Sequence, residues 1–185
     1  MEDIFEPFME VIRRRRTIRV YQKREVPKEV IEKLIRAAFY SPSSKNLRPW
    51  HFIIVESDDL KQKLSEATPW SKPAKNAPVV IVVLAEEKSE KWIEDCSIAA
   101  EHIQLAATAL GLGACWIQIR GNFHNDEPAE DYVRRLLGIP SNFRVECLVA
   151  VGYPAESKGP HTDEKIRWER VYSEKFGNVW LKNSR

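Results

Sequence analysis

The stretch P-V-V-I-V-V-L, from Pro78 to Leu84, decides the fold. It is a continuous aliphatic, mostly β-branched run, which predicts a central strand buried on both faces of a sheet. Periodicity elsewhere predicts further strands at 51–55, 114–119 and 144–153. Helical spacing of apolar residues predicts helices at 4–12, 27–38, 89–112 and 127–137, with a further one that carries Leu60 and Leu64 after a cap at Ser57 or Asp58. Strands alternating with helices place the chain among the α/β or α+β layered folds.

Two segments have more apolar side chains than a surface helix or a free tail would have. The helix predicted from Ser89 to Leu112 is apolar on most of its faces, so we expect its own sheet or another subunit to cover it. The polar tail from 154 to 185 contains Trp168, Phe176 and Trp180 among its aromatic residues. A free tail would not retain these groups, and we expect it to dock on its own domain or on a partner.

Composition excludes several classes of protein. The chain has 185 residues, the length of one ordinary domain, and 29 basic against 27 acidic residues leave a net charge of +2, which gives no global argument for nucleic acid or an anionic membrane. Its three cysteines lie inside apolar segments, which is typical of reduced thiols in a cytoplasmic protein. The histidines show no metal-ligand spacing, and no apolar run approaches the roughly 20 residues of a membrane span. We therefore expect a single soluble domain, 1–185, without metal, membrane or nucleic-acid partners.

The most basic stretch is R-R-R-R-T-I-R, Arg13 to Arg19. Such a cluster is usually a solvated helix end, and a nucleic-acid patch is the other simple interpretation, although no stacking aromatic residues accompany it. Thr17 and Arg19 suggest a third interpretation, because guanidinium groups and a hydroxyl that converge at a chain reversal can hold a phosphate.

Three further polar segments interrupt the apolar pattern. The loop S-P-S-S-K-N-L-R-P-W, Ser41 to Trp50, offers hydroxyl, amide and backbone donors to a planar heterocycle or a phosphate, although its residues are also ordinary turn formers. W-I-Q-I-R-G, Trp116 to Gly121, ends a strand in polar residues, where ligands often bind. K-I-R, Lys165 to Arg167, is either a solvated charge pair or part of a site.

The order of these motifs along the chain resembles the nitroreductase family of FMN-dependent oxidoreductases. The resemblance rests on R-R-T-I-R, P-S-S-K-N-L-R-P-W, G-L-G-A-C-W-I and A-V-G-Y-P-A-E, and it spans about 11–177. It implies an α+β fold with a central mixed β-sheet flanked by helices. It also implies an intertwined homodimer whose C-terminal arm, 154–185, reaches the partner subunit, with FMN bound at the interface.

The resemblance also implies roles for particular residues. Arg15, Arg16, Lys165 and Arg167 would face the FMN phosphate, and Thr17 would add a hydroxyl. Arg19 would approach the pyrimidine edge of the flavin and favour the charge that develops there on reduction. The remaining cofactor-binding residues implied are Pro42, Ser43, Ser44, Asn46, Trp116, Ile117 and Gln118, with Pro42 to Ser44 supplied by the opposite subunit.

The implied activity is transfer of hydride from NADH or NADPH to an electron-poor small molecule, such as a nitroaromatic or a quinone, by a ping-pong mechanism. No side chain is expected to be an obligatory acid or base, because the cofactor carries the chemistry. Two alternatives stay open: an FMN sensor or carrier without turnover, and a specialised reductase or dehydrogenase on the same scaffold. Because the chain is short, we also expect Thr68 to Pro73, with Trp70, to form part of the pocket rim.

Overall fold

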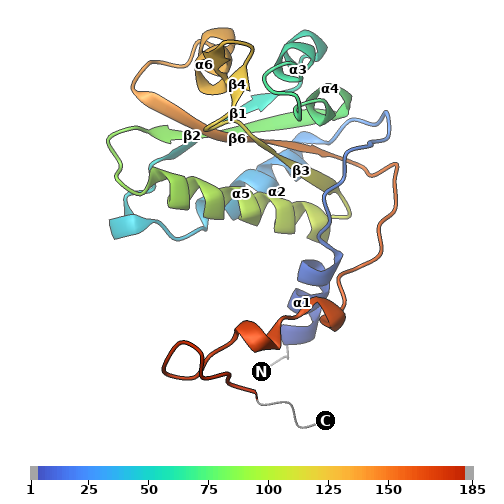
Figure 1. Cartoon of the computed structure of the whole chain (residues 1–185). Coiled ribbons are helices and arrows are strands. Elements are labelled where there is room, and N and C mark those ends of the chain that lie inside the picture. Colours follow the sequence, from blue (N-terminus) through green and yellow to red (C-terminus); the bar gives the residue numbers. More distant parts are fainter. Residues whose placement is uncertain (1–3, 182–185) are drawn as a thin grey trace.

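The computed structural model describes residues 4–181 and has the predicted α+β architecture (Figure 1). Its central sheet has the strand order β1-β2-β6-β3. The strands are β1 (Trp50–Val55), β2 (Val79–Glu86), β3 (Gly113–Gln118) and β6 (Phe143–Gly152). Every pair of neighbouring strands is antiparallel. In the part of the chain that the structure describes, parallel pairing is confined to one bridge between Thr17 and Ala114, so the sheet is mixed only at this edge.

Helices cover both faces of the sheet. Figure 1 shows α2 (Lys28–Phe39) and α5 (Trp92–Ala109) on one face, and α3 (Asp58–Leu64), α4 (Pro73–Asn76) and α6 (Ala129–Leu137) on the other. The remaining elements are α1 (Phe5–Arg14), the two-residue strands β4 (Phe123–His124) and β5 (Glu127–Pro128), and 3₁₀ turns at Ser44–Asn46, Asp163–Lys165 and Trp168–Arg170. The sequence did not predict α4 or the β4–β5 ribbon, because elements this short leave no periodic pattern.

β2 is buried on both faces, as its sequence predicts. Val79, Ile81 and Val83 point into the core beneath α2 and α5. The alternate residues, Val80 and Val82, point into the core beneath α3, α4 and α6. All five are at most 1% exposed. The strand therefore requires a helical layer on each side, and this requirement sets the three-layer architecture.

The predicted helix ends are confirmed to within a few residues. The Ser57 hydroxyl accepts the Leu60 N–H at 3.5 Å and caps α3, as predicted. α5 begins at Trp92 rather than Ser89, because a turn, in which the Trp92 N–H donates to the Ser89 carbonyl, precedes it. Beyond its last turn, Gly111 adopts φ +74°, a conformation that favours glycine, and the chain reverses into β3.

The segment after α1 is anchored on the edge of the sheet beside β3. The Ile18 N–H donates to the Ala114 carbonyl at 2.9 Å. The buried Tyr21 hydroxyl lies 2.6 Å from the Ile18 carbonyl and 3.1 Å from that of Ala150, so it joins this segment to β6. Gly113 makes the close approach feasible, since a Cβ atom there would lie 2.6 Å from the Ile18 Cβ. The arginine-rich segment is thereby fixed relative to the sheet.

The tail leaves the body after β6 and returns along α1 (Figure 1). Its aromatic residues contact one another: Trp168 lies 6.2 Å from Trp180, and Tyr172 lies 4.6 Å from Phe176, between ring centroids. Phe176 is nevertheless 91% exposed. The last residues of the predicted arm, 182–185, lie outside the described part of the chain. Within that part, no helix is both long enough and apolar enough to cross a membrane.

We predict that Gly113→Ala lowers the free energy of unfolding by about 1–3 kcal/mol, the usual range for overpacking, because the new methyl group must displace Ile18. Gly159→Ala is the matched control, since nothing lies within 4 Å of a Cβ at that position. Urea unfolding of both variants measures the difference. Equal stability of the two variants would contradict the close packing of Gly113 on Ile18.

Candidate cofactor-binding site

Four basic side chains gather where the tail crosses the segment after α1. The backbone N–H of His161 donates to the Arg13 carbonyl at 2.9 Å, and the Arg16 guanidinium donates to the Gly159 carbonyl. Partial desolvation and then the charges of Arg16, Lys165 and Arg15 lower the pKa of His161. The structure thus brings together Arg15, Arg16 and Lys165, as predicted, and adds His161, which sequence reasoning missed. We call these four residues the basic cluster.

The neighbouring cations differ in how far they are neutralised. Arg13 and Arg14 pair with glutamates of α1 itself, Arg13 with Glu6 at 3.2 Å, so these two arginines stabilise a helix end. Arg15 lies 3.4 Å from Glu101 of α5. Arg167, predicted beside the others, has its ion pair with Glu169 at 3.7 Å. Arg13, Arg14 and Arg167 are thus already paired with carboxylates, which leaves fewer guanidiniums for a bound anion than the sequence suggests.

Thr17 and Arg19 lie on the extended segment that follows the basic cluster. The Lys158 ammonium donates to the Thr17 carbonyl. The Arg19 N–H donates to the Glu156 carboxylate at 2.6 Å, and this backbone hydrogen bond is the main cause that lowers the pKa of Glu156. The Arg19 side chain is exposed, and in the described part of the chain it has no hydrogen bond or ion pair of its own. Its position is therefore fixed by the backbone while its guanidinium is free.

The polar loop between α2 and β1 has an unusual backbone. Lys45, Asn46 and Arg48 have φ values of 52°, 54° and 48°, in the left-handed region that is costly for side chains with a Cβ. The Ser43 hydroxyl accepts the Arg48 N–H at 2.9 Å, which closes the loop on itself. Pro42 and Asn46 are exposed, and Ser43 is half-buried. The loop is thus held in one strained shape with polar groups on its surface.

Asp95 of α5 holds this loop against the body. It is 3% exposed, and its Oδ1 accepts the Ser44 N–H at 2.9 Å. Its Oδ2 is buried and has no hydrogen-bond partner in the described part of the chain. It lies in the first turn of α5, near the positive end of the helix dipole. The sequence analysis assigned Asp95 no role, and a charged residue on an otherwise apolar helix was the available signal.

At the end of β3, the predicted residues point to both faces of the sheet. Trp116 packs on the α5 side, and its indole N–H donates to the Gln118 side-chain oxygen at 2.8 Å. The Ile117 side chain is 2% exposed and lies in the opposite core, so only its backbone is available to a ligand. The Gln118 amide also donates to the Arg120 carbonyl and the Glu146 carboxylate, at 3.1 and 3.2 Å. It is held in one orientation.

One chain does not bring all of these groups together. The loop contacts α5 at Asp95, in its first turn, whereas Thr17 pairs with Ala114, after its last turn (Figure 1). The helix between these points is about 20 Å long at 1.5 Å per residue. In the described part of the chain, no hydrogen bond or ion pair joins the loop to the segment 15–19. The two backbone anchors are thus at opposite ends of α5, although the Arg15 side chain reaches back to Glu101, in the middle of the helix.

The predicted rim residue Trp70 lies elsewhere. It is 77% exposed, in the turn between α3 and α4. These helices cover the face of the sheet opposite α5, so within one chain Trp70 does not adjoin the basic cluster or the loop (Figure 1). A rim at Thr68 to Pro73 therefore stays a prediction, and one chain alone does not place it beside the other candidate residues.

The cysteines are core residues, as the sequence indicates. Burial raises the pKa of the Cys96, Cys115 and Cys147 thiols, and all three are free. Among residues 4–181, no group of three or more His, Cys, Asp and Glu side chains is arranged to hold a metal ion. The chemistry that the described residues offer is therefore that of cations, amides and backbone N–H groups.

Comparison with known proteins gives consistent matches over most of the chain. A model of the Nitroreductase family matches residues 12–72 and 68–153. A solved structure of an FMN-dependent nitroreductase from Clostridium difficile R20291 is 41% identical, with a TM-score of 0.89, and the match covers 91% of this chain and 99% of that one.

Two curated relatives show the range of activities among similar proteins. A Methanothermobacter thermautotrophicus protein, named provisionally as an NADH dehydrogenase/NAD(P)H nitroreductase, is 41% identical over 91% of this chain and 87% of its own. An iodotyrosine deiodinase of Thermotoga neapolitana is 28% identical over 85% of this chain and 94% of its own. The family model alone spans well over half of the sequence. This chain belongs to the nitroreductase family.

Proposed function

We propose that this protein is an FMN-dependent oxidoreductase that takes electrons from NADH or NADPH and passes them to an electron-poor small molecule. FMN, when bound, supplies the hydride chemistry. The names of the C. difficile and M. thermautotrophicus relatives support both cofactors. The observation that carries the proposal in this chain is the basic cluster, which offers cations in the position where the family motif requires a phosphate site.

The basic cluster fits a phosphate monoester by its chemistry. Arg15, Arg16 and Lys165 each have charged donors, and the lowered pKa of His161 reflects partial desolvation first and then repulsion by these three cations. A dianionic phosphate would relieve this repulsion and accept charge-assisted hydrogen bonds from the same groups. Thr17 adds a hydroxyl, and Arg167 would join only if the tail adjusts. In this proposal the cluster binds the cofactor and takes no part in proton transfer.

The remaining residues would orient the flavin ring. The free guanidinium of Arg19 would lie at the pyrimidine edge, where a fixed cation favours negative charge. Ser43, Ser44 and Asn46 would supply polar contacts from the strained loop, and Pro42 an apolar one. Trp116, Ile117 and Gln118 would lie along the other side, Ile117 through its backbone. None of these side chains needs to act as an obligatory acid or base.

A homodimer would complete the site. The loop and the segment 15–19 are separated along α5 in one chain, and a second copy can bring its loop to the cluster of the first. Exposed apolar side chains on α1, α2 and the tail, such as Phe8, Phe39 and Phe176, support an interface between copies. The arm 154–185 would then lie against the partner subunit.

The proposal is tested by the visible spectrum of the purified protein under anaerobic conditions, before and after one equivalent of NADH and then of NADPH. We expect flavin bands that bleach rapidly with one or both donors. Steady-state rates with a quinone or nitroaromatic acceptor should give parallel double-reciprocal lines, as a ping-pong mechanism requires.

Other outcomes of this experiment point to other functions. Bound flavin that no nicotinamide bleaches would favour a sensor or carrier. Reduced protein that reacts with 3-iodotyrosine faster than with a quinone would favour the dehalogenation suggested by the T. neapolitana relative. Failure to bind FMN at all would contradict the proposed function and the assigned residues.

We predict that Asp95→Ala weakens FMN binding by about tenfold or more, because the Ser44 N–H loses a charged acceptor and the strained loop is released. Asp95→Asn keeps an acceptor oxygen and should recover most of the affinity. Glu94→Ala is the control, since it removes a neighbouring acid of the same helix turn. Fluorescence titration of the apoprotein with FMN measures the effect, and equal affinity in all three variants would rule out the positioning role.

We predict that Phe176→Ser raises the dissociation constant of the homodimer at least tenfold, because Phe176 is 91% exposed in one chain and would be buried against the partner. Trp70→Ser is the matched control, because Trp70 is also largely exposed but lies on the opposite side of the sheet. Sedimentation equilibrium measures both. A wild-type protein that stays monomeric at micromolar concentration would overturn the proposed dimer.

A further inference from the structure

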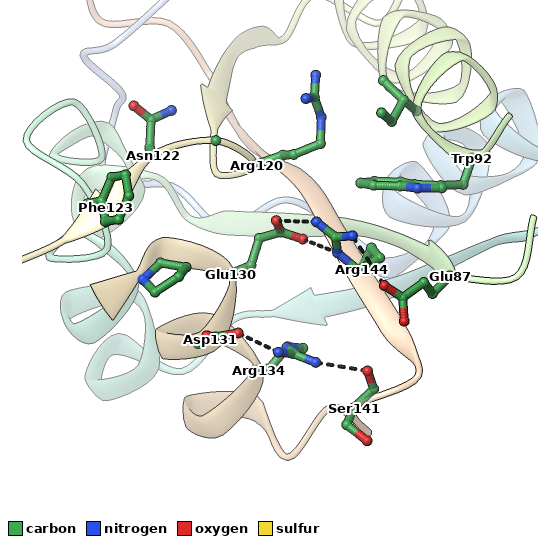
Figure 2. A pocket seen from close by; sticks show the side chains of 13 residues that line it. Glu87, Trp92, Arg120, Asn122, Phe123, Glu130, Asp131, Arg134, Ser141 and Arg144 are labelled. Atoms are coloured by element: carbon green, nitrogen blue, oxygen red, sulfur yellow. Dashed lines mark hydrogen bonds and ion pairs between the residues drawn. The ribbon is translucent and has the colours of Figure 1, made fainter. Parts of the chain in front are cut away.

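A pocket lies at the end of the sheet where β3 stops and β6 begins. It has a volume of about 770 Å³, and its walls come from the start of α5, the segment after β3, α6 and the first residues of β6 (Figure 2). This volume is within the range of small-molecule sites. Trp92 and Phe123 contribute aromatic surface, and three arginines, Arg120, Arg134 and Arg144, contribute charge.

Two of the three arginines use both of their Nη groups within the protein. Arg144 donates from Nε and Nη2 to the two Glu130 oxygens at 3.0 and 2.9 Å, and from Nη1 to Glu87 at 3.3 Å. Arg134 donates to the Ser141 carbonyl at 2.9 Å and to Asp131. Figure 2 shows both guanidiniums held between their acceptors. Each acidic residue that lines the pocket among the described residues, Glu87, Glu130 and Asp131, is thus paired with one of these two arginines.

Arg120 is different. Its Nε donates to the Glu146 Oε2 at 2.6 Å, and among residues 4–181 neither of its Nη atoms has a hydrogen bond. Its side chain is 36% exposed, whereas that of Glu146 is 2% exposed. The guanidinium is thus fixed from behind by a buried carboxylate while two amino groups remain available. This arrangement suits an oxyanion, which a guanidinium binds through two parallel hydrogen bonds.

A β-bulge places Glu146. β2 pairs Val83 with Cys147 and Leu84 with Val145, so Glu146 has no partner on that strand. As a result, Val145 and Cys147 point into opposite cores, although two residues apart they would ordinarily share a face. The Glu146 carbonyl accepts the N–H groups of both Ile119 and Arg120, at 3.2 and 3.1 Å. The extra residue therefore aims a carboxylate at Arg120, as bulges beside functional sites often re-aim a side chain.

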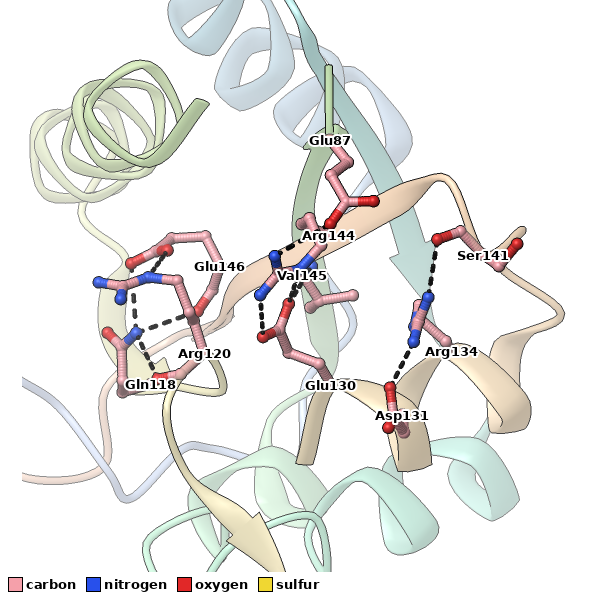
Figure 3. A network of polar contacts seen from close by, with 10 residues as sticks. All are labelled: Glu87, Gln118, Arg120, Glu130, Asp131, Arg134, Ser141, Arg144, Val145 and Glu146. Atoms are coloured by element: carbon pink, nitrogen blue, oxygen red, sulfur yellow. Dashed lines mark hydrogen bonds and ion pairs between the residues drawn. The ribbon is translucent and has the colours of Figure 1, made fainter. Parts of the chain in front are cut away.

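The same carboxylate joins the pocket to the proposed flavin site. The Gln118 amide donates to the Glu146 Oε1 at 3.2 Å (Figure 3). The Gln118 side-chain oxygen accepts the Trp116 indole N–H at 2.8 Å. Trp116, Gln118, Glu146 and Arg120 thus form one hydrogen-bonded network. Its first two members are assigned to the flavin, and its last lines the pocket. A substrate held by Arg120 would lie next to the residues that orient the cofactor.

We propose that this pocket is a substrate subsite for a ligand that carries an oxyanion group, and that the two Nη atoms of Arg120 are its anchor. The group is a carboxylate or a phosphate, and two sources can supply it: a carboxylate on the electron acceptor or a phosphate of the nicotinamide donor. Arg120 acts as a specificity-determining residue, and Glu146 is a positioning residue that acts through it. As a substrate subsite the pocket rests on the proposed function, whereas anion binding itself can be measured without turnover.

Calorimetric titration of the FMN-loaded protein with benzoate and with its neutral isostere benzamide tests the proposal. We expect the wild type to bind benzoate about tenfold or more tightly than benzamide, the effect of one charge-assisted interaction. Arg120→Lys keeps a cation for Glu146 but loses the planar fork, and should abolish most of this preference. Arg134→Gln is the matched control and should keep it, because that guanidinium is already occupied.

A second variant separates binding from folding. Arg120→Gln alone would leave Glu146 buried and unpaired, which can unfold a protein. The double variant Arg120→Gln with Glu146→Gln removes both charges while the amide of residue 146 can still accept from Gln118. We expect it to fold, as measured by urea unfolding, and to bind benzoate and benzamide equally. A wild type without preference for benzoate, or a preference that survives in both Arg120 variants, would overturn the proposal.

Two further measurements identify the source of the oxyanion. Titration with ADP tests a phosphate of the donor, and the ratio of kcat/KM for 4-nitrobenzoate to that for nitrobenzene tests a carboxylate on the acceptor. If Arg120→Lys weakens ADP binding, the source is the donor phosphate. If it lowers the ratio of kcat/KM for 4-nitrobenzoate to that for nitrobenzene, the source is the acceptor carboxylate. The proposed function fails separately: if benzoate binding depends on Arg120 but no nicotinamide bleaches the flavin, the anion site stands and the oxidoreductase assignment falls.

Discussion

The burial of β2 on both faces is the constraint on which the rest of the structure depends. A strand with Val, Ile and Leu side chains on both sides needs a helical layer against each, which places α2 and α5 opposite α3, α4 and α6. Polar side chains are then confined to the ends and edges of the sheet. The strained loop and the arginine pocket lie near the first turn of α5, and the basic cluster contacts the middle of this helix through Arg15.

The sequence predicted the strands and helices that have a continuous or periodic apolar pattern. The apolar run at Pro78 to Leu84 and the period of α5 have one simple structural solution each, and both were confirmed. It also predicted that Arg15, Arg16 and Lys165 share a site, through the family resemblance rather than through periodicity. The bulge at Glu146 could not be predicted, because one extra residue in a strand changes which face each later side chain occupies without changing the composition. A single glutamate within an apolar strand was its available signal.

In one chain, the two parts of the candidate cofactor site, the basic cluster and the strained loop, have separate anchors. The cluster that would bind phosphate is fixed to the sheet edge through Thr17 and Ala114, and the loop that would bind the ring is fixed to α5 through Asp95. Closing the gap by motion within a chain would break the Ser44–Asp95 or the Ile18–Ala114 hydrogen bond. Association of two copies needs no such change. The division of the site therefore favours assembly over flexibility.

Stability alone does not explain the pair of Glu146 and Arg120. Only the Glu146 side of the pair is buried, and the desolvation of its carboxylate offsets most of the attraction to the partly exposed guanidinium. This pair also requires a bulge that interrupts the pairing of β2 with β6. The arginines that serve packing and charge balance in the same pocket, Arg134 and Arg144, use both of their Nη groups, whereas Arg120 uses neither. A guanidinium held at such structural cost, with its donors unused, is better suited to binding a ligand than to holding the fold together.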